Sequence, residues 1–133
     1  MSEVLPYSGL TGMADAVLSE VAALAKLACD TGETASINLT AMPLTRQDRE
    51  AIETRLGRGE VEATVDAGGR CDVWETAYAG VWFVRYRGLD DRVATEAIEI
   101  CPSPLILMSH PDDRRVAATR LGEDLRAAAS AAA

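Results

Sequence analysis

The middle of the chain, from residue 60 to residue 100, carries the feature that most constrains the fold. Residues 60–66 and 93–100 alternate between polar and apolar side chains, and residues 71–78 and 81–87 are rich in β-branched and aromatic side chains. Short turn signals separate these stretches: Gly68-Gly69, Ala79-Gly80 and Gly88-Leu89-Asp90-Asp91. Because short connections make successive strands antiparallel, the sequence predicts a four-stranded meander.

Two helical stretches precede this meander. Residues Gly12 to Asp30 contain no proline and no internal glycine, and they stop before Gly32, which predicts a helix. Its apolar surface is wider than the stripe of an ordinary surface helix. We therefore expect this helix to lie deep in its own domain or to be covered by a second chain, and we favour the first reading slightly. Thr45, with Asp48 three residues later, predicts a shortened capping box at the start of a second helix.

A short strand and a third helix complete the predicted elements. Residues 35–40 alternate and predict a strand at one edge of the sheet. Pro102 and Pro104 end the sheet, because proline cannot donate a hydrogen bond to a β-ladder. We expect a last helix from about Pro111, fraying after Ser130. Its expected inner stripe comprises Ala117, Leu121, Leu125 and Ala128.

This order of elements predicts one α+β domain over residues 1–133, with an irregular lead-in over residues 1–11. We expect an antiparallel four- to five-stranded meander sheet with about three helices packed on one face. The length of 133 residues and the 48% of hydrophobic residues suit a single domain with its own core. The net charge of −8 disfavours binding to nucleic acid and to an anionic membrane surface.

The three cysteines indicate a reducing compartment. Cys29, Cys71 and Cys101 are odd in number and show no C-x-x-C spacing. The first residues lack the basic and apolar segments of a signal peptide, and no apolar run approaches the roughly 20 residues that a membrane span needs. We therefore expect a cytoplasmic protein.

Patterns typical of catalytic or metal sites are weak. His110 is the single histidine and precedes a proline at a helix start, where a surface position is the simplest interpretation. There is no Gly-x-Ser-x-Gly nucleophile motif and no P-loop, and Arg70 beside Cys71 is the one local hint of an activated thiol. We expect no enzyme, no catalytic residue, no metal ligand and no cofactor, while a metal site assembled from two chains stays open.

The hairpin around Ala79-Gly80 carries the most unusual side chains. If these two residues form the turn, Trp74 faces Arg85 in a cation–π arrangement on one side of the sheet, and Glu75 and Trp82 lie on the other side. A sheet covered on one side cannot hide both tryptophans, so we expect one of them to line a groove or a partner surface. The alternative is that both tryptophans cap the edges of the core.

Glu75 and Glu99 fall on strands that neighbour the same central hairpin. Two close and partly buried carboxylates can perform acid–base catalysis. A solvated face of an acidic protein explains them more simply, and we assign them no catalytic role.

A series of short motifs gives the chain a family resemblance. In chain order they are Met42-Pro43-Leu44-Thr45, Asp48, Leu56-Gly57-Arg58-Gly59-Glu60-Val61, Ala63, Glu75-Thr76, Gly80-Val81-Trp82, Val84-Arg85 and Ile98-Glu99. With this order and spacing, residues 42–125 resemble the C-terminal conserved region of the HupH/HyaF-type hydrogenase expression/formation proteins. Members of that family are longer, with a further region ahead of this one, where the chain has its helix at residues 12–30.

The resemblance implies a bacterial cytoplasmic accessory protein for the maturation of NiFe hydrogenase, an assembly factor or chaperone that binds a hydrogenase subunit or another hydrogenase accessory protein. It implies no catalytic residue. The candidate partner-binding residues are Glu75, Trp82, Arg85 and Glu99, which match the motifs, and Trp74 from the same hairpin. Homodimerisation through the helix at residues 12–30 is a further expectation. The alternatives are a metal or iron–sulfur carrier that uses the cysteines across a dimer and an unrecognised small-molecule-binding domain.

Overall fold

The computed structural model describes residues 9–66 and 68–132 and has the predicted α+β architecture. Its centre is a five-stranded antiparallel sheet with the strand order β1-β5-β4-β3-β2. The strands are β1 (Ala35–Asn38), β2 (Glu62–Asp66), β3 (Arg70–Glu75), β4 (Val81–Arg87) and β5 (Val93–Ile100). The meander of four strands and the edge strand that joins it are therefore confirmed.

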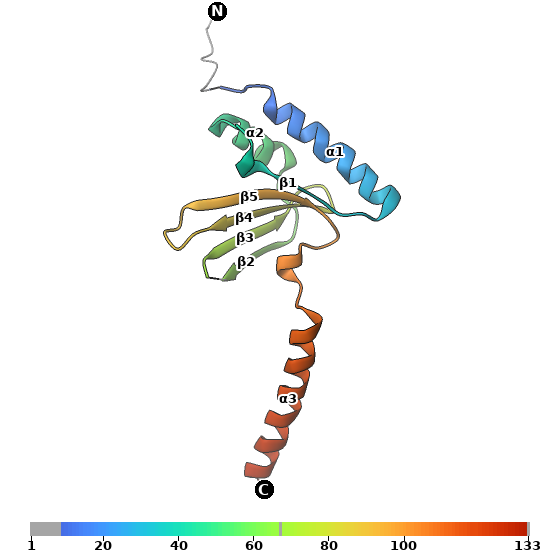
Figure 1. The fold of residues 1–133 in the computed structure, drawn as a ribbon, viewed down its shortest axis with the longest axis vertical. Helices are drawn as coiled ribbons and strands as arrows, with labels where there is room; N and C mark the ends of the chain where they lie inside the picture. Colours follow the sequence, from blue (N-terminus) through green and yellow to red (C-terminus); the bar gives the residue numbers. More distant parts are fainter. Residues whose placement is uncertain (1–8, 67, 133) are drawn as a thin grey trace, which may run out of the picture.

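The helices differ in how they relate to the sheet. They are α1 (Met13–Thr31), α2 (Arg46–Leu56) and α3 (Pro111–Ala132), with two short 3₁₀ segments, η1 (Leu39–Ala41) and η2 (Leu105–Leu107). Figure 1 shows α1 and α2 on one side of the sheet, whereas α3 leaves from the other side and points away from the body. None of the described helices is long and apolar enough to cross a membrane.

The main core lies between the sheet and the helices α1 and α2. Its central row runs across three strands, where Trp74 pairs with Phe83 and Phe83 pairs with Ile98, and all three side chains are buried. The other buried members of this core are Ala14, Val17, Val21, Ile37, Leu39, Ile52, Leu56 and Val81. Burial of these side chains is what holds α1 and α2 on the sheet.

Helix α1 has the predicted extent but not the expected depth. It ends at Gly32, which adopts a left-handed conformation with φ of 76°, and the Gly32 N–H donates to the Ala28 carbonyl oxygen at 2.8 Å. Only Ala14, Val17 and Val21 of this helix are buried, and Leu27 stays exposed. The expectation of a helix deep in its own domain is wrong, because α1 lies on the surface and buries one stripe. Leu18, Leu24 and Ala25 beside this stripe are only partly buried, and the alanines farther from it are exposed.

The predicted capping box at the start of α2 is confirmed. The Asp48 N–H donates to Thr45 Oγ1 at 3.0 Å, and the Thr45 N–H donates to Asp48 Oδ2 at 3.1 Å. Asp48 also accepts hydrogen bonds from the backbone N–H and the hydroxyl of Thr11, at 3.0 and 2.7 Å. Burial acts to raise the pKa of Asp48, but the hydrogen bonds from Thr11 and Thr45 outweigh it and lower the pKa.

Helix α3 does not pack on the sheet, which corrects the expected layer of about three helices on one face. It has no buried residue among those described, and the stripe expected to face inward is open, with Leu121 60% and Leu125 62% exposed. The helical pattern that predicts an apolar stripe is present, but the stripe meets no surface of its own chain. The helix continues through Ala132, past Ser130, where we expected fraying to begin.

The turn between β3 and β4 is longer than predicted. Residues 76–80 connect the strands instead of Ala79-Gly80 alone, because the Thr76 hydroxyl bonds to the backbone of Tyr78 and ends the ladder early. Trp74 consequently pairs with Phe83 and not with Arg85. The register differs from the predicted one by two residues, so each side chain keeps its predicted side of the sheet.

Candidate functional site

The face of the sheet away from α1 and α2 lacks a helix and is the candidate functional surface. Strand periodicity places on it every residue adjacent in sequence to the buried row of Trp74, Phe83 and Ile98. We call this surface the open face. It comprises Ser36, Asn38, Ala63, Val65, Cys71, Val73, Glu75, Trp82, Val84, Tyr86, Thr95, Ala97 and Glu99.

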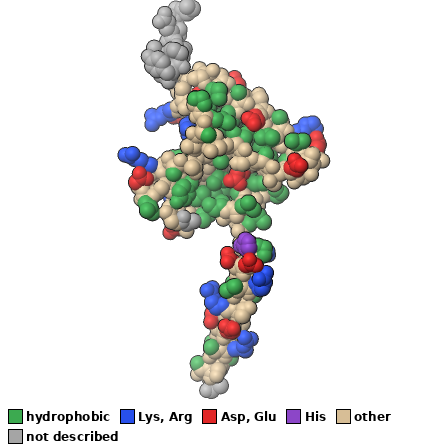
Figure 2. Space-filling view, in the orientation of Figure 1, with side chains coloured by type: hydrophobic (Ala, Val, Ile, Leu, Met, Phe, Trp, Pro, Cys, Tyr) green, Lys and Arg blue, Asp and Glu red, His purple; other side chains and the backbone are tan. Residues whose placement is uncertain are grey.

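The open face is predominantly apolar. A second hydrophobic cluster centres on the buried residues Cys71, Val73 and Trp82, and partly buried apolar side chains surround it. In Figure 2, hydrophobic side chains gather over the lower part of the body, where the strands lie in Figure 1. The centre of this surface is therefore buried by its own chain, and the large apolar side chains beside it that stay exposed include Leu105 and Met108, from the segment after β5. Exposed apolar surface on a soluble domain can mark a binding site, which makes this border of the open face the candidate site.

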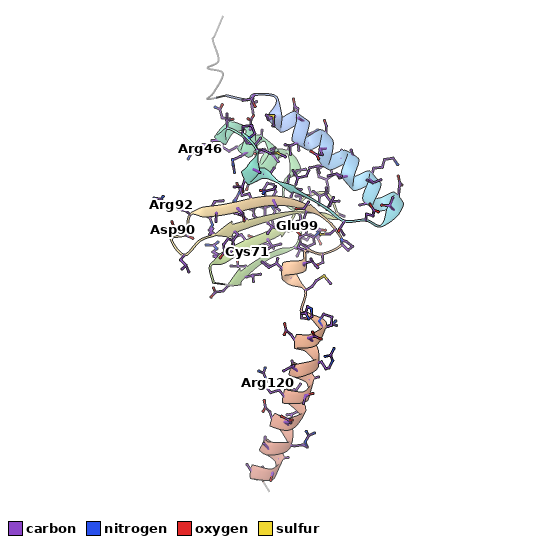
Figure 3. All side chains as sticks on the ribbon, in the orientation of Figure 1. Arg46, Cys71, Asp90, Arg92, Glu99 and Arg120 are labelled. Atoms are coloured by element: carbon purple, nitrogen blue, oxygen red, sulfur yellow. The ribbon has the colours of Figure 1, made fainter. Side chains whose placement is uncertain are left out.

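Glu99 lies on the open face beside a cavity. In the sheet it pairs with Ser36 of β1 on one side and with Trp82 of β4 on the other, and Figure 3 shows it and Cys71 on the strands of the body. The cavity has a volume of about 610 Å³. It is lined by Thr34, Ala35, Ser36, Glu99, Cys101, Pro102, Ser103, Leu105 and Met108.

The carboxylate of Glu99 is poorly compensated. Burial raises its pKa, and within the described residues no hydrogen bond and no basic side chain acts against that rise. Leu105 and Met108, which also line the cavity, are exposed. The site therefore offers an apolar hollow with one carboxylate that has no internal partner, which suits a ligand that is apolar and carries a hydrogen-bond donor or a positive charge.

Trp82 is buried on the open face and holds the segment that forms the cavity wall. Its side chain is 5% exposed, and its indole N–H donates to the carbonyl oxygen of Cys101 at 3.1 Å. This bond fixes the residues after β5 against the sheet, with Leu107 packed on the same cluster. The expectation that one tryptophan lines an open groove is therefore wrong. The connector after β5 covers Trp82, so both indoles are hidden although helices cover only one face.

Glu75 shapes the turn between β3 and β4. Its Oε2 accepts a hydrogen bond from the Gly80 N–H at 3.1 Å, and Gly80 has a positive φ of 81° that favours glycine. Glu75 pairs across the strands with Trp82. The two glutamates of the open face therefore flank Trp82, but only Glu75 has a hydrogen-bond donor in the described residues that fixes its position.

Trp74 and Arg85 lie on the opposite, helix-covered face. Trp74 is 2% exposed and stacks on Phe83 with ring centroids 5.0 Å apart. The predicted cation–π arrangement is confirmed, since the guanidinium carbon of Arg85 lies 5.1 Å from the centre of the Trp74 ring. Arg58 approaches the same ring at 4.1 Å. The Trp74 indole N–H is buried without a hydrogen-bond partner, so this aromatic group is held by packing and by the two cations.

Arg85 also forms the centre of an ion-pair network that ties α2 to the sheet. Its guanidinium contacts Glu53 of α2 and Glu96 of β5, each at 2.8 Å, and Arg49 of α2 contacts Glu96 at 2.6 Å. Burial acts to lower the pKa of Arg85, but the hydrogen bonds and charges of both glutamates raise it overall. Every charged group of this network thus has a partner within the chain.

The cysteines do not converge on a shared site. Cys71 is buried and Cys29 is exposed on α1. Burial raises the pKa of the Cys71 thiol, and the charges of Asp72 and Glu99 raise it further. Burial and Glu99 also raise the pKa of Cys101, against a smaller opposing effect of a backbone hydrogen bond at Ser103. These shifts favour neutral thiols, and Arg70 pairs with Asp72 at 2.9 Å instead of activating Cys71.

Histidine and acidic side chains likewise form no metal cluster within the described part of the chain, where no group of three or more His, Cys, Asp or Glu side chains is placed to hold an ion. His110 is exposed at the start of α3, where its Nδ1 accepts a hydrogen bond from the Asp112 N–H at 3.1 Å. That placement confirms the interpretation of a surface residue at a helix start. The metal or iron–sulfur carrier alternative, which needs donors from two chains, stays a prediction.

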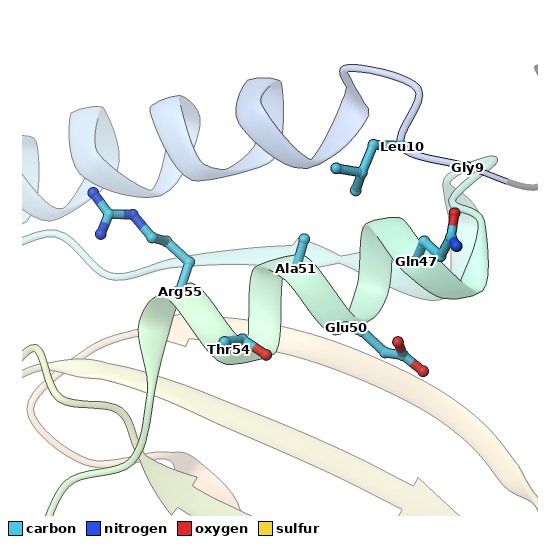
Figure 4. A pocket seen from close by; sticks show the side chains of 7 residues that line it. All are labelled: Gly9, Leu10, Gln47, Glu50, Ala51, Thr54 and Arg55. Atoms are coloured by element: carbon cyan, nitrogen blue, oxygen red, sulfur yellow. The ribbon is translucent and has the colours of Figure 1, made fainter. Parts of the chain in front are cut away.

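A second hollow lies between residues 9–10 and α2 (Figure 4), with a volume of about 850 Å³. It is lined by Gly9, Leu10, Gln47, Glu50, Ala51, Thr54 and Arg55. In Figure 4 the labelled side chains of α2 point in different directions instead of converging on one point. Its size exceeds that of the cavity at Glu99, but it offers no buried and unpartnered polar group to a ligand.

Sequence reasoning missed the part of the site that comes from the connector after β5. Ser103, Leu105 and Met108 line the cavity, and none of them was a candidate, while Cys101 was considered only as a metal ligand. The available signal was the apolar run of residues 105–108. It lies between two prolines and the start of the last helix, so it belongs to neither the sheet nor a helix.

Comparison with known proteins agrees with the architecture and with the motif series. Residues 12–128 match the family model described as the HupH hydrogenase expression protein, C-terminal conserved region. The chain belongs to this family. The match extends beyond residues 42–125, on which the resemblance was based, and it includes α1 and most of α3.

Individual members of the family show the same relationship. A solved structure, the hydrogenase expression protein HupH from Thiobacillus denitrificans, is 37% identical with a TM-score of 0.79, and the match covers 89% of this chain and 97% of that one. The hydrogenase expression/formation protein HupH of Rhodobacter capsulatus is 30% identical over 90% of this chain and 46% of its own length. The corresponding protein HoxQ of Azotobacter vinelandii is 31% identical over 66% of this chain and 31% of its own length. The chain thus spans less than half the length of these two curated relatives.

Proposed function

We propose that this chain is a protein-binding assembly factor that holds a segment of a hydrogenase subunit on its open face during maturation of the enzyme. Membership of the hydrogenase expression protein family supports the hydrogenase context. The observation that carries the binding role is the half-buried Glu99 carboxylate, which has no internal partner and borders an apolar cavity of about 610 Å³.

The chemistry of the cavity defines the segment that fits it. Leu105 and Met108 present apolar surface, and Glu99 requires a donor or a cation once water is removed. A client segment of apolar side chains with one lysine or arginine meets both requirements. An acidic segment is excluded, because a second carboxylate near Glu99 brings like charges together in a poorly solvated site.

The five candidate residues have different positions in this proposal. Glu99 contacts the client, Trp82 positions the cavity wall through its bond to Cys101, and Glu75 holds the adjoining turn. Trp74 and Arg85 are left out of the contact surface, because they lie under α2 on the covered face. A cytoplasmic location and homodimerisation through α1 stay predictions.

The test is capture of the hydrogenase subunits from hydrogenase-producing cells under anaerobic conditions, with the retained proteins identified by mass spectrometry. The informative variant is Leu105→Asp, whose side chain is 81% exposed, so that the substitution leaves the core intact. Leu89→Asp is the matched control, since Leu89 is 91% exposed in the turn between β4 and β5, at the other end of these strands.

We expect Leu105→Asp to reduce the captured subunit about 10-fold or more and Leu89→Asp to leave it unchanged, because a charge on the cavity wall opposes an apolar client. Cooperative thermal unfolding of both variants checks that the fold is retained. Equal capture by the two variants, or capture of no hydrogenase subunit by the unmodified chain, contradicts the proposal.

A further inference from the structure

Helix α3 lacks packing partners within the described part of the chain. It is 22 residues long, and none of its described side chains is buried. In globular proteins most of the stability of a helix comes from packing of its apolar side, which α3 lacks, and Gly122 in its interior costs about 1 kcal/mol relative to alanine. In the described part of the chain its arginines form a single ion pair, between Arg115 and Asp112 at 3.0 Å. Its own contacts therefore contribute little to keeping it helical.

One side of α3 carries an apolar stripe that is suited to packing against another surface. Arg114, Ala118, Leu121 and Leu125 follow one another at intervals of four, three and four residues, which places them in one stripe along the helix. Ala117 and Ala128 widen this stripe. Val116, by contrast, lies on the opposite side among charged side chains. We call the first set the α3 stripe.

The open face complements the α3 stripe in polarity and in charge. Among its described positions it carries two carboxylates, Glu75 and Glu99, and no lysine or arginine, because the strand arginines at positions 70, 85 and 87 project to the other face. Glu99 is the carboxylate without an internal partner. The α3 stripe begins with Arg114, so an apolar helix surface with one leading cation meets an apolar sheet surface with one free anion.

The dimensions match as well. A helix of 22 residues is about 33 Å long at about 1.5 Å per residue. The five strands span about 19 Å at about 4.8 Å per interval. One α3 is therefore long enough to span the part of the open face that the connector after β5 leaves uncovered.

The helix does not reach the open face of its own chain. The Trp82 indole fixes Cys101 to the sheet, Pro102 and Pro104 stiffen the next residues, and α3 then runs away from the body, as Figure 1 shows. We propose that α3 of one copy packs through the α3 stripe on the open face of a second copy, and that the second copy reciprocates. The result is a symmetric dimer in which each free helix covers the apolar surface that stays exposed beside Glu99 on the other chain.

This exchange has a consequence for the client surface. In the dimer, Arg114 of one protomer pairs with Glu99 of its partner, and the leucines of the α3 stripe cover the partner's cavity. Self-association and capture of a third protein through the open face then compete with each other. The dimer itself requires only the two surfaces of this chain, whatever client the open face takes.

Sedimentation equilibrium of the full chain over a range of concentrations tests the proposal. We expect a species of twice the 14.2 kDa chain mass. The double substitution Leu121→Lys with Leu125→Lys is expected to raise the dimer dissociation constant about 100-fold or more, because it puts two charges into the apolar contact. Val116→Lys is the matched control on the other side of the same helix and leaves the constant unchanged. All three positions are exposed, so the body of the fold is unaffected.

Further measurements separate the alternatives. Glu99→Gln and Arg114→Gln each raise the dissociation constant about 5- to 10-fold, and the double variant loses less than the product of the two effects, because the residues act as a pair. A chain that is monomeric at every concentration overturns the proposal, including the case in which hydrogen exchange finds α3 protected on its own sheet. A dimer that survives the double lysine substitution but dissociates with Leu27→Lys on α1 also overturns it.

The test of dimerisation can fail while the capture test of the proposed function succeeds, and the reverse. The double lysine variant is monomeric and leaves Glu99 and Leu105 in place, so it captures the hydrogenase subunit at least as well as the unmodified chain if the proposed function is right. Loss of dimerisation without any capture refutes the proposed function alone, and capture by a chain that never dimerises refutes the exchange alone.

Discussion

The two faces of the sheet each bury a tryptophan next to charged groups, but they differ in how these charges are compensated. On the covered face, Trp74 is enclosed by Phe83 and two guanidinium groups, and Arg85 and Glu96 are joined in one network. On the open face, Trp82 is hidden only by the connector after β5, and Glu99 has no partner among the described residues. Both faces thus bury a tryptophan beside charged groups, but the buried charges of the covered face are paired within the chain, whereas Glu99 is not.

The contrast indicates which face serves the fold and which is left for binding. A charge that is paired within the chain is a structural component, and its removal is felt in stability. A charge that is desolvated and unpaired lowers stability and is retained where another molecule compensates it. By this criterion the covered face is structural, and the open face is the surface that we propose for binding. The following experiments test that division.

The largest expected effect is on the core of the covered face. Phe83→Ala removes a fully buried ring that stacks on Trp74 and should lower the free energy of unfolding by about 3–5 kcal/mol. Val84→Ala, the next residue and on the open face, should cost less than about 1.5 kcal/mol, because its side chain is half-buried and smaller. Urea unfolding followed by circular dichroism at low protein concentration measures both values. Equal losses would show that the open face is as well covered in solution as the other.

A smaller loss is expected from breaking the ion-pair network. Arg85→Met leaves the buried Glu96 with Arg49 alone and should lower the free energy of unfolding by about 2–3 kcal/mol. Arg92→Met is the control, since Arg92 is exposed in a turn and its contact with Asp90 is 3.9 Å long, so the change should stay below about 0.5 kcal/mol. The same urea titration applies. An Arg85→Met variant as stable as the control would show that the ion-pair network does not stabilise the fold.

Asp48 should contribute to the acid side of the stability profile. Its pKa is lowered in the folded protein, so its contribution is fully present above the unfolded value near 3.8 and is lost as the pH falls through the folded value. Asp48→Asn should therefore be less stable than the unmodified chain at neutral pH, and the difference should shrink below pH 3.8. Thermal unfolding between pH 2 and 7 gives the curve. A constant difference across this range contradicts the assignment.

The smallest effect, and one of opposite sign, is expected at Glu99. Burial raises its pKa above the ordinary value of 4.5, so folding loses stability as the pH rises through the folded pKa. Glu99→Gln should equal the unmodified chain below pH 4.5 and gain on it toward neutral pH. The same thermal series measures it, in the monomeric background with Leu121→Lys and Leu125→Lys. A loss of stability at neutral pH would mean that Glu99 has an internal partner in solution.

Much of the sheet was predictable because its signals are local. Alternation fixed the faces of the strands, and the capping box of Thr45 and Asp48 placed α2 correctly. The assignment of Trp74 with Arg85 and of Trp82 with Glu75 to opposite sides survived an error in the turn. The predicted register between β3 and β4 was wrong by two residues. Because side chains alternate between the two faces of a strand, a shift by an even number of residues leaves each side chain on its predicted face.

The remaining features depend on contacts that a local pattern does not contain. The burial of Trp82 is set by the connector after β5, which has no periodicity of its own. The stripe of α3 was predicted from its spacing, but spacing does not say which surface meets the stripe, and the chain's own sheet does not. Glu99 was noted from its place in a motif, whereas its lack of a partner follows from the arrangement of three strands.

The two indoles on opposite sides of one sheet give the protein a separate optical reporter for each surface. Trp74 emits from between two cations and a phenyl ring under α2, and Trp82 emits from a donor contact to the segment that leads into α3. Replacing either one with phenylalanine leaves a single fluorophore. Emission from a chain that keeps only Trp82 then follows events at the connector, and emission from a chain that keeps only Trp74 follows the integrity of the helical layer.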